Sequence, residues 1–214
     1  MTASSGPVVV LVDWNGTVVL DTVRARESLN GVLRARGLVS LDAQGFSREF
    51  HLPMADMFVR LGVADPLVAE AEWNARMAAS PAALRPGMGA VHELASSGGA
   101  RLGVISAASA GAVGADIAAH GLAAVWDTVD TSVSDKLAVL RERRGDEPLA
   151  LYVGDTCYDM RCAVEASYIP VAVSGGYTAV DLLRDAGAAH VIDSFDELVG
   201  LLAALAPAAT ALPS

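Results

Sequence analysis

The chain has 214 residues, with 15 basic and 25 acidic side chains, a formal net charge of −10, and a hydrophobic content of 53%. This length fits one sizeable domain or a domain with a modest insertion, and the apolar content excludes intrinsic disorder. A chain this acidic has no general attraction for nucleic acid or for an anionic membrane surface. Any phosphate that it binds must therefore meet local cations or a metal ion.

The two cysteines, Cys157 and Cys162, and four scattered histidines lack the number and spacing of zinc ligands. We therefore expect reduced thiols, as in the cytosol. The residues before the apolar run Val8–Val12 include no basic residue, and that run is too short for a signal peptide or a membrane span. Together these features predict a cytoplasmic protein that binds neither membranes nor nucleic acid.

Short apolar, β-branched runs recur along the chain and predict buried parallel strands. The predicted strands are Val8–Trp14, Arg101–Ala107, Pro148–Thr156 and Ile169–Ser174, with weaker ones at Val125–Val129 and Ala189–Asp193. The predicted helices between and after them are Gly87–Ser97, Ala110–His120, Ser134–Arg144, Tyr158–Ala166, Val180–Ala186 and Phe195–Leu205. This alternation predicts an α/β fold, a Rossmann-like parallel sheet that helices cover on both faces.

One long segment interrupts this alternation, because residues 21–84 contain no convincing strand. Within it, Thr22–Arg36, Met54–Leu61 and Pro66–Ala79 read as helices. More than about 60 residues is too long for a loop inside a compact domain. We therefore expect a small all-helical cap of residues 21–84, inserted after the first strand, on a core formed by residues 1–20 and 85–214.

Polar side chains stand at the ends of the predicted strands, where open parallel sheets bind their ligands. Asp13, Ser106 and Asp155 end three of these strands, and Asp159 lies one helical turn beyond Asp155. The sole lysine of the chain, Lys136, opens a helix between the second and third of these strands. Carboxylates suit Mg²⁺, the hydroxyl and the ammonium suit a phosphate, and a carboxylate can act as a nucleophile.

Four segments also carry a resemblance to a known family. They are Asp13–Thr17 (DWNGT), Val104–Ser106 (VIS), Lys136 and Gly154–Asp159 (GDTCYD). In this order, with a helical insert after the first, they resemble the motifs of the haloacid dehalogenase-like hydrolase superfamily. The nearest branch is the phosphoglycolate-phosphatase-like one, which has a helical, C1-type cap between the first and second motifs. The resemblance spans nearly the whole chain.

The resemblance implies a Mg²⁺-dependent phosphatase of a small phosphorylated metabolite. Asp13 would be the nucleophile that forms an aspartyl-phosphate. The metal ion would be bound by Asp13, Asp155 and the backbone carbonyl of Asn15. Asp159 would hold a metal-bound water or orient its neighbours.

The phosphoryl group would be bound by Ser106 and Lys136, and Lys136 would also offset the charge of the crowded carboxylates. Further substrate contacts are expected from Thr17 and Ala107 in the core and from Arg48 and His51 in the cap. Arg48, His51 and Arg60 surround a break that contains Pro53, and in capped proteins of this kind such a loop points toward the core site.

The chain departs from the family at position 15, where the phosphatases usually have an aspartate that serves as general acid and base. Asn15 can form hydrogen bonds but cannot exchange a proton near neutral pH. Its backbone carbonyl is unaffected, so the expected metal site is retained. The acid–base step is therefore weakened, and the alternative is a catalytically impaired relative that still binds a ligand.

Two other reactions of the family remain as less favoured alternatives. Hydrolysis of a carbon–phosphorus bond needs a lysine in the cap for a Schiff base, and the chain has no lysine before Lys136. Dehalogenation needs no metal ion. The retention of Asp155 and Asp159 beside a carboxylate nucleophile argues against it, because such carboxylates are best explained when a cation separates them.

Overall fold

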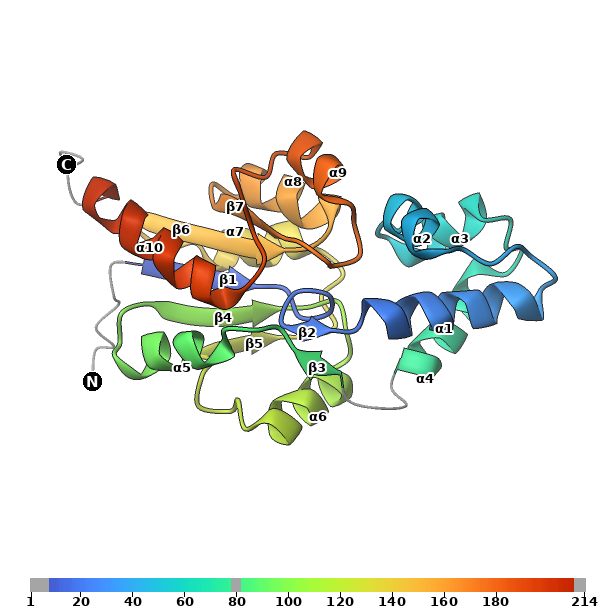
Figure 1. Ribbon diagram of the computed structural model, residues 1–214, viewed down its shortest axis with the longest axis horizontal. Coiled ribbons are helices and arrows are strands. Elements are labelled where there is room, and N and C mark those ends of the chain that lie inside the picture. The colour runs from blue at the N-terminus through green and yellow to red at the C-terminus, as the bar shows by residue number, and fades with distance from the viewer. Residues whose placement is uncertain (1–7, 78–81, 210–214) are drawn as a thin grey trace.

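The computed structural model of the chain describes residues 8–77 and 82–209 (Figure 1). The N-terminal segment before Val8 and the last two residues of the predicted helix Pro66–Ala79 lie outside the described residues. In the described part of the chain, no helix is long and apolar enough to cross a membrane.

Six parallel strands form the central sheet, in the order β5-β4-β1-β6-β7-β8. They are β1 (Val8–Val12), β4 (Arg101–Ile105), β5 (Thr128–Asp130), β6 (Leu149–Gly154), β7 (Ile169–Val173) and β8 (His190–Ile192). All five residues of β1 are buried, which explains why this strand is apolar on both faces. The α/β class and the parallel sheet predicted from the sequence are confirmed.

The helices that flank the sheet are α5 (Met88–Ser96), α6 (Ala110–His120), α7 (Lys136–Arg143), α8 (Cys157–Glu165), α9 (Val180–Asp185) and α10 (Phe195–Ala209). The side chains of β1 alternate between two hydrophobic clusters. Val8, Val10 and Val12 share one cluster with residues of α5 and α10, which run in front of the sheet in Figure 1. Val9 and Leu11 share the other cluster with residues of α7 and α8. Helices therefore cover both faces of the sheet.

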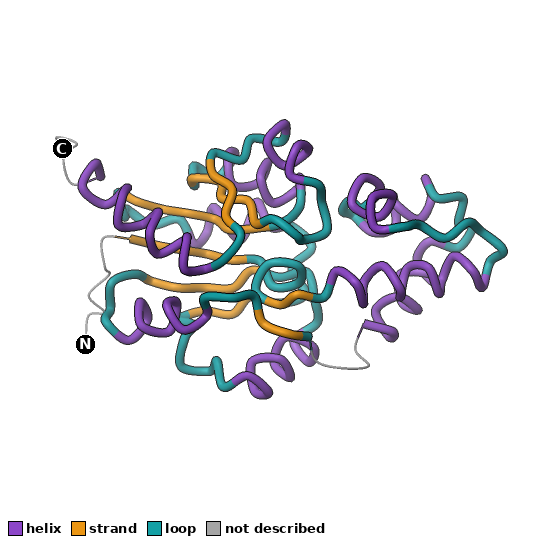
Figure 2. Tube along the Cα trace, viewed as in Figure 1, coloured by secondary structure: helices purple, strands orange, loops and turns teal. Residues whose placement is uncertain are grey.

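A second group of four helices lies between β2 (Val19–Leu20) and β3 (Ala83–Leu84), which pair as a short antiparallel ribbon. These helices are α1 (Thr22–Ala35), α2 (Ala43–Glu49), α3 (Met54–Arg60) and α4 (Pro66–Met77). They have their own hydrophobic cluster, and they lie beyond the carboxyl ends of the core strands (Figures 1 and 2). This arrangement supports the predicted division into a core of residues 1–20 and 85–214 and a cap of residues 21–84, which stays a prediction.

Four short elements differ from the sequence-based expectation. The strands β2 and β3 have two residues each, too few to produce a periodic pattern. The helix α2 has seven residues, and the side chain of Asp42 caps its first turn by accepting a hydrogen bond from Gly45 N. The weak strand predicted at Val125–Val129 lies further along the chain, at Thr128–Asp130. The helical group therefore follows the second strand of the chain, not directly the first.

Candidate active site

The site lies at the carboxyl edge of the three central strands. Asp13, Ser106 and Asp155 are the first residues after β1, β4 and β6, and β1 pairs with both neighbours. The parallel register brings Val12 opposite Val104 and Val153, so the residues that follow the strands meet at one edge. All three polar side chains are buried, with exposed fractions of 6%, 1% and 0%.

Asp155 is held in place by two hydrogen bonds from the core. The Thr17 hydroxyl donates to its Oδ1 at 3.2 Å, and the backbone N–H of Tyr177 donates to its Oδ2 at 2.7 Å. Gly16 packs against the same carboxylate, at a φ of +74°. A Cβ added there would lie 2.0 Å from Asp155 Oδ2, so only glycine fits both the backbone conformation and the space.

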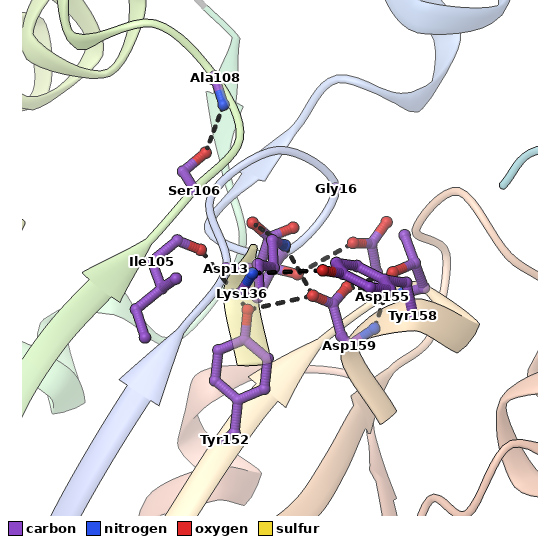
Figure 3. A network of polar contacts seen from close by, with 12 residues as sticks. Asp13, Gly16, Ile105, Ser106, Ala108, Lys136, Tyr152, Asp155, Tyr158 and Asp159 are labelled. Carbon is purple, nitrogen blue, oxygen red and sulfur yellow. Dashed lines mark hydrogen bonds and ion pairs between the residues drawn. The ribbon is translucent and has the colours of Figure 1, made fainter. Parts of the chain in front are cut away.

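Lys136 joins two of the carboxylates. Its Nζ lies 2.9 Å from Asp13 Oδ1 and 2.7 Å from Asp159 Oδ1, and its side chain is 1% exposed (Figure 3). Lys136 therefore forms salt bridges with Asp13 and Asp159, which agrees with the expectation that it offsets the charge of the crowded carboxylates. Burial alone would lower the pKa of Lys136, but the charges of Asp13 and Asp159 raise it well above its usual value, so the ammonium stays protonated.

Asp159 accepts hydrogen bonds on both carboxylate oxygens. Its Oδ1 accepts from Lys136 Nζ and, at 3.0 Å, from the Tyr152 hydroxyl. Its Oδ2 accepts from the backbone N–H and the hydroxyl of Thr156, which caps α8 in a reciprocal capping box. Because four donors engage Asp159, these contacts favour its expected role of orienting its neighbours.

Asp13, Asp155 and Asp159 each offer an oxygen within 4.8 Å of the others. Burial is the main reason why the pKa of Asp13 is raised to about 6, and it also raises the pKa of Asp155, with the neighbouring Asp13 adding to the effect. Together with Lys136, the three carboxylates carry a net charge of −2 when all are ionised. Oxygen donors and this charge fit a divalent hard cation such as Mg²⁺.

Ser106 and Ala107 occupy the turn that follows β4. The Ser106 backbone N–H donates to Asp130 O at 2.9 Å, and its Oγ accepts from Ala108 N at 3.1 Å (Figure 3). Ala107 is exposed. The hydroxyl of Ser106 is thus oriented by a tight turn, and its own proton remains available for donation.

Asn15 and Thr17 lie on the turn after Asp13. The Asn15 amide is half-buried and donates from Nδ2 to Asp21 Oδ2 at 2.6 Å. The hydroxyl of Thr17, predicted to contact substrate, is buried and donates to Asp155. In the structure Thr17 therefore supports the acidic cluster.

The two cap residues predicted to bind substrate, Arg48 and His51, line a cavity of about 270 Å³ between the cap and α8. Arg60 and Arg161 also line this cavity, whereas Asp13, Ser106 and Lys136 do not. Arg48 forms an ion pair with Asp181 of the core at 3.0 Å, and His51 Nδ1 lies 2.9 Å from Glu49 O. The structure thus places the two cap residues next to the start of α8, and no residue of the acidic cluster lines their cavity.

Two residues that support the site were not predicted. Arg85 is 3% exposed, and its guanidinium donates to the carbonyls of Gly16 and Thr17 at 2.6 and 2.7 Å and to Ser174 O at 2.9 Å. It therefore fixes the turn that follows Asp13. Tyr177, whose backbone binds Asp155, belongs to the hydrophobic cluster of the cap. An isolated arginine and an isolated tyrosine carry no sequence pattern that would have revealed these contacts.

No protein-family model and no curated protein matches the sequence. Solved structures do match. A predicted phosphatase from Clostridium acetobutylicum superposes with a TM-score of 0.79 at 20% identity, covering 94% of this chain and 100% of that one. A haloacid dehalogenase-like hydrolase from Bacteroides fragilis gives a TM-score of 0.74 at 19% identity, with coverages of 91% and 100%. CbbY from Rhodobacter sphaeroides, in complex with phosphate, gives 0.67 at 25% identity, with coverages of 89% and 95%.

These similarities confirm the resemblance to the haloacid dehalogenase-like hydrolases and the fold class that accompanies it. One of these structures is of a predicted phosphatase, one is of a haloacid dehalogenase-like hydrolase, and the third contains bound phosphate. The likeness shows that this chain shares their fold.

Replacing Lys136 with Met should strongly destabilise the metal-free protein, because the buried carboxylates of Asp13 and Asp159 would lose the cation that they share. We expect the free energy of unfolding in urea to fall by about 3–5 kcal/mol. The matched control is Arg141→Met on the same helix, where the ion pair is exposed and 3.9 Å long. That change should alter stability by at most about 1 kcal/mol. Equal effects of the two substitutions would contradict this account.

The raised pKa of Asp13 predicts a pH dependence of stability in the metal-free protein. The Asp13 carboxyl has a pKa near 4 in the unfolded chain and a pKa of about 6 in the folded protein. Because the folded protein holds this proton more tightly, ionisation of Asp13 opposes folding. Stability should therefore fall between pH 4 and pH 6 and then level off. Asp13→Asn should remove up to about 3 kcal/mol of this loss. The measurement is urea denaturation with EDTA across this pH range. A difference between the two proteins that stays constant with pH would refute the assignment.

Proposed function

We propose that this chain, which has the fold of the haloacid dehalogenase-like hydrolases, is a Mg²⁺-dependent phosphatase of a small phosphorylated metabolite. The observation that carries the proposal is the buried cluster of Asp13, Asp155 and Asp159 with Lys136 between two of them. The structures of a predicted phosphatase and of CbbY with bound phosphate support it.

Asp13 and Asp155, with the backbone carbonyl of Asn15, would hold the metal ion. When bound, the ion supplies positive charge that neutralises the carboxylates and the phosphoryl oxygens. Asp13 is the proposed nucleophile, because it directly follows the central strand and its Oδ1 is held at 2.9 Å by Lys136. One Asp13 oxygen forms a bond to phosphorus as the bond to the leaving group breaks, which gives an aspartyl-phosphate.

The protein groups around Asp13 serve the transferring phosphoryl group. Lys136 and the hydroxyl of Ser106 would donate to its oxygens, and Ala107 would border it through the same turn. Water then attacks the phosphorus, which releases phosphate and restores the Asp13 carboxylate. Asp159 keeps the Lys136 ammonium in position during both steps, through the contact at 2.7 Å.

We further propose that Arg48 and His51 bind the part of the substrate that does not react. Their cavity is also lined by Thr156, the residue that follows Asp155 in the chain, so it lies on the side of the cap that faces the start of α8. A guanidinium and an imidazole favour an anionic or strongly polar group there. Movement of the cap over the strand ends would then exclude water during phosphoryl transfer.

A second candidate function rests on the amide at position 15. Because Asn15 cannot deliver a proton, the chain could bind a phosphorylated ligand with little turnover. One measurement distinguishes the two functions: a phosphatase releases phosphate repeatedly from a substrate in excess over the protein, whereas a binding protein does not.

The direct test is phosphate release with Mg²⁺ from a panel of phosphorylated metabolites. Activity should disappear with EDTA, and Asp13→Asn should lower kcat at least about 10³-fold while the far-ultraviolet circular dichroism spectrum is unchanged. Asp116→Asn is the control, because Asp116 is also buried but accepts its hydrogen bond from Trp14. Turnover that persists in Asp13→Asn would disprove the proposed nucleophile, and binding without turnover would favour the second candidate.

The amide at position 15 also predicts a preference among substrates. General acid catalysis contributes about 10²–10⁴-fold, and Asn15 cannot supply it. Acyl and activated aryl phosphates, whose leaving groups need little protonation, should therefore react at least about 10²-fold faster than alkyl phosphates. The measurement compares kcat/KM for acetyl phosphate and p-nitrophenyl phosphate with that for glycerol phosphate. Similar values for all three would show that another group delivers the proton.

A further inference from the structure

The cavity that contains Arg48 and His51 is strongly basic. Arg60 and Arg161 also line it, so three guanidinium groups and one imidazole surround a volume of about 270 Å³. Among the residues that the structure describes, no aspartate or glutamate lines this cavity. Such a concentration of cations, in a chain whose net charge is −10, favours a ligand that carries negative charge.

Both the cap and the core contribute to this cavity. Arg48, His51 and Arg60 belong to α2, to α3 and to the loop between them, which lie on the side of α8 and α9 in Figure 1. Arg161 lies on α8, and Thr178 lies on the loop that follows β7. A ligand in the cavity would therefore contact both parts of the protein.

The guanidinium groups can turn to such a ligand at little cost. Arg48 pairs with Asp181 and Arg60 pairs with Glu49, each at 3.0 Å, and all four side chains are at least 41% exposed. Exposed ion pairs of this kind contribute little to stability. Arg161 is exposed and forms no salt bridge with any described residue.

Two uncharged groups add to the same preference. Thr178 is 4% exposed, yet its hydroxyl has no hydrogen-bond partner among the described residues. A buried hydroxyl without a partner is unfavourable, and an oxyanion in the cavity would supply the missing acceptor. Cys157, the first residue of α8, also lines the cavity, so the positive end of this helix dipole lies beside it.

We propose that this cavity binds a second anionic group of the substrate, with Arg161 and Thr178 as core residues that determine specificity. The inference rests on the proposed phosphatase function, and it narrows the substrate to a phosphate ester that also carries a carboxylate or a second phosphate. Guanidinium groups bind either oxyanion through charge-assisted hydrogen bonds. Phe50, Leu52 and Leu182 form apolar walls that suit the carbon skeleton between the two anionic groups.

The experiment compares two aryl phosphates that differ by one charge, 4-carboxyphenyl phosphate and its amide, 4-carbamoylphenyl phosphate. In the wild type with Mg²⁺, the KM of the carboxylated compound should be at least about tenfold lower, with similar kcat values. Arg161→Met should raise this KM at least about fivefold and leave the KM of the amide unchanged. The control is Arg141→Met, an exposed arginine of α7 outside the cavity, which should change neither KM.

Thr178→Val removes only the hydroxyl. It should raise the KM of the carboxylated compound about threefold without lowering the Tm, because the wild-type hydroxyl is buried and unpaired. A residue with a merely structural role would instead change the Tm and leave the difference between the two substrates as it is.

Equal KM values for the two compounds in the wild type would overturn the proposal, and so would equal effects of R161M on both. Benzoate, which carries the carboxylate alone, should inhibit hydrolysis of the carboxylated compound competitively. Noncompetitive inhibition would overturn the proposal, because the cavity would then hold an anion separate from the substrate. If the wild type releases phosphate from neither compound, the proposed function fails. Their dissociation constants, measured by calorimetric titration of the wild type and R161M, then decide whether the cavity binds the second charge.

Discussion

The structure depends on the placement of one ammonium group among three buried carboxylates. Lys136 contacts Asp13 at 2.9 Å and Asp159 at 2.7 Å, while Asp155 lies beside them and forms no salt bridge with the residues that the structure describes. Burying charges of one sign is unfavourable unless cations compensate them. When all three carboxylates are ionised, the remaining charge of −2 fits the divalent cation that we propose for this site, and the same charge distribution would suit the transfer of a phosphoryl group.

The rest of the core keeps these groups in place. The two faces of β1 pack against separate clusters, which fixes the direction in which Asp13 leaves the strand. Gly16 leaves room for the Asp155 carboxylate, and Arg85 ties the Gly16 and Thr17 carbonyls to the loop after β7. The ring of Tyr177 packs against Phe46 and Phe50 of the cap, with centroids 5.6 and 4.5 Å apart. The cap and the acidic cluster are thus joined through the residue whose backbone holds Asp155.

The site residues at the strand ends can be predicted from the sequence, because each is a polar side chain that directly follows a strand-like apolar run. Asp13, Ser106 and Asp155 each follow a continuous apolar run, and Lys136 is conspicuous as the sole lysine. Asp21 and Arg85 could not be predicted in the same way. Asp21 resembles an ordinary helix cap, and Arg85 reaches carbonyls 68 and 69 residues away in the chain. Such contacts depend on how distant segments of the chain pack together, and the local pattern of apolar and polar residues does not predict that packing.

The most direct test of this account is calorimetric titration of the metal-free protein with Mg²⁺ near pH 6, in buffers of different ionisation enthalpy. We expect one ion to bind per chain with release of protons, because the cation lowers the raised pKa of Asp13. Asp155→Asn should abolish this binding, whereas Asp116→Asn should preserve it. Absence of Mg²⁺ binding in the wild type, or equal binding by Asp155→Asn, would contradict the assignment of the acidic cluster as the metal centre.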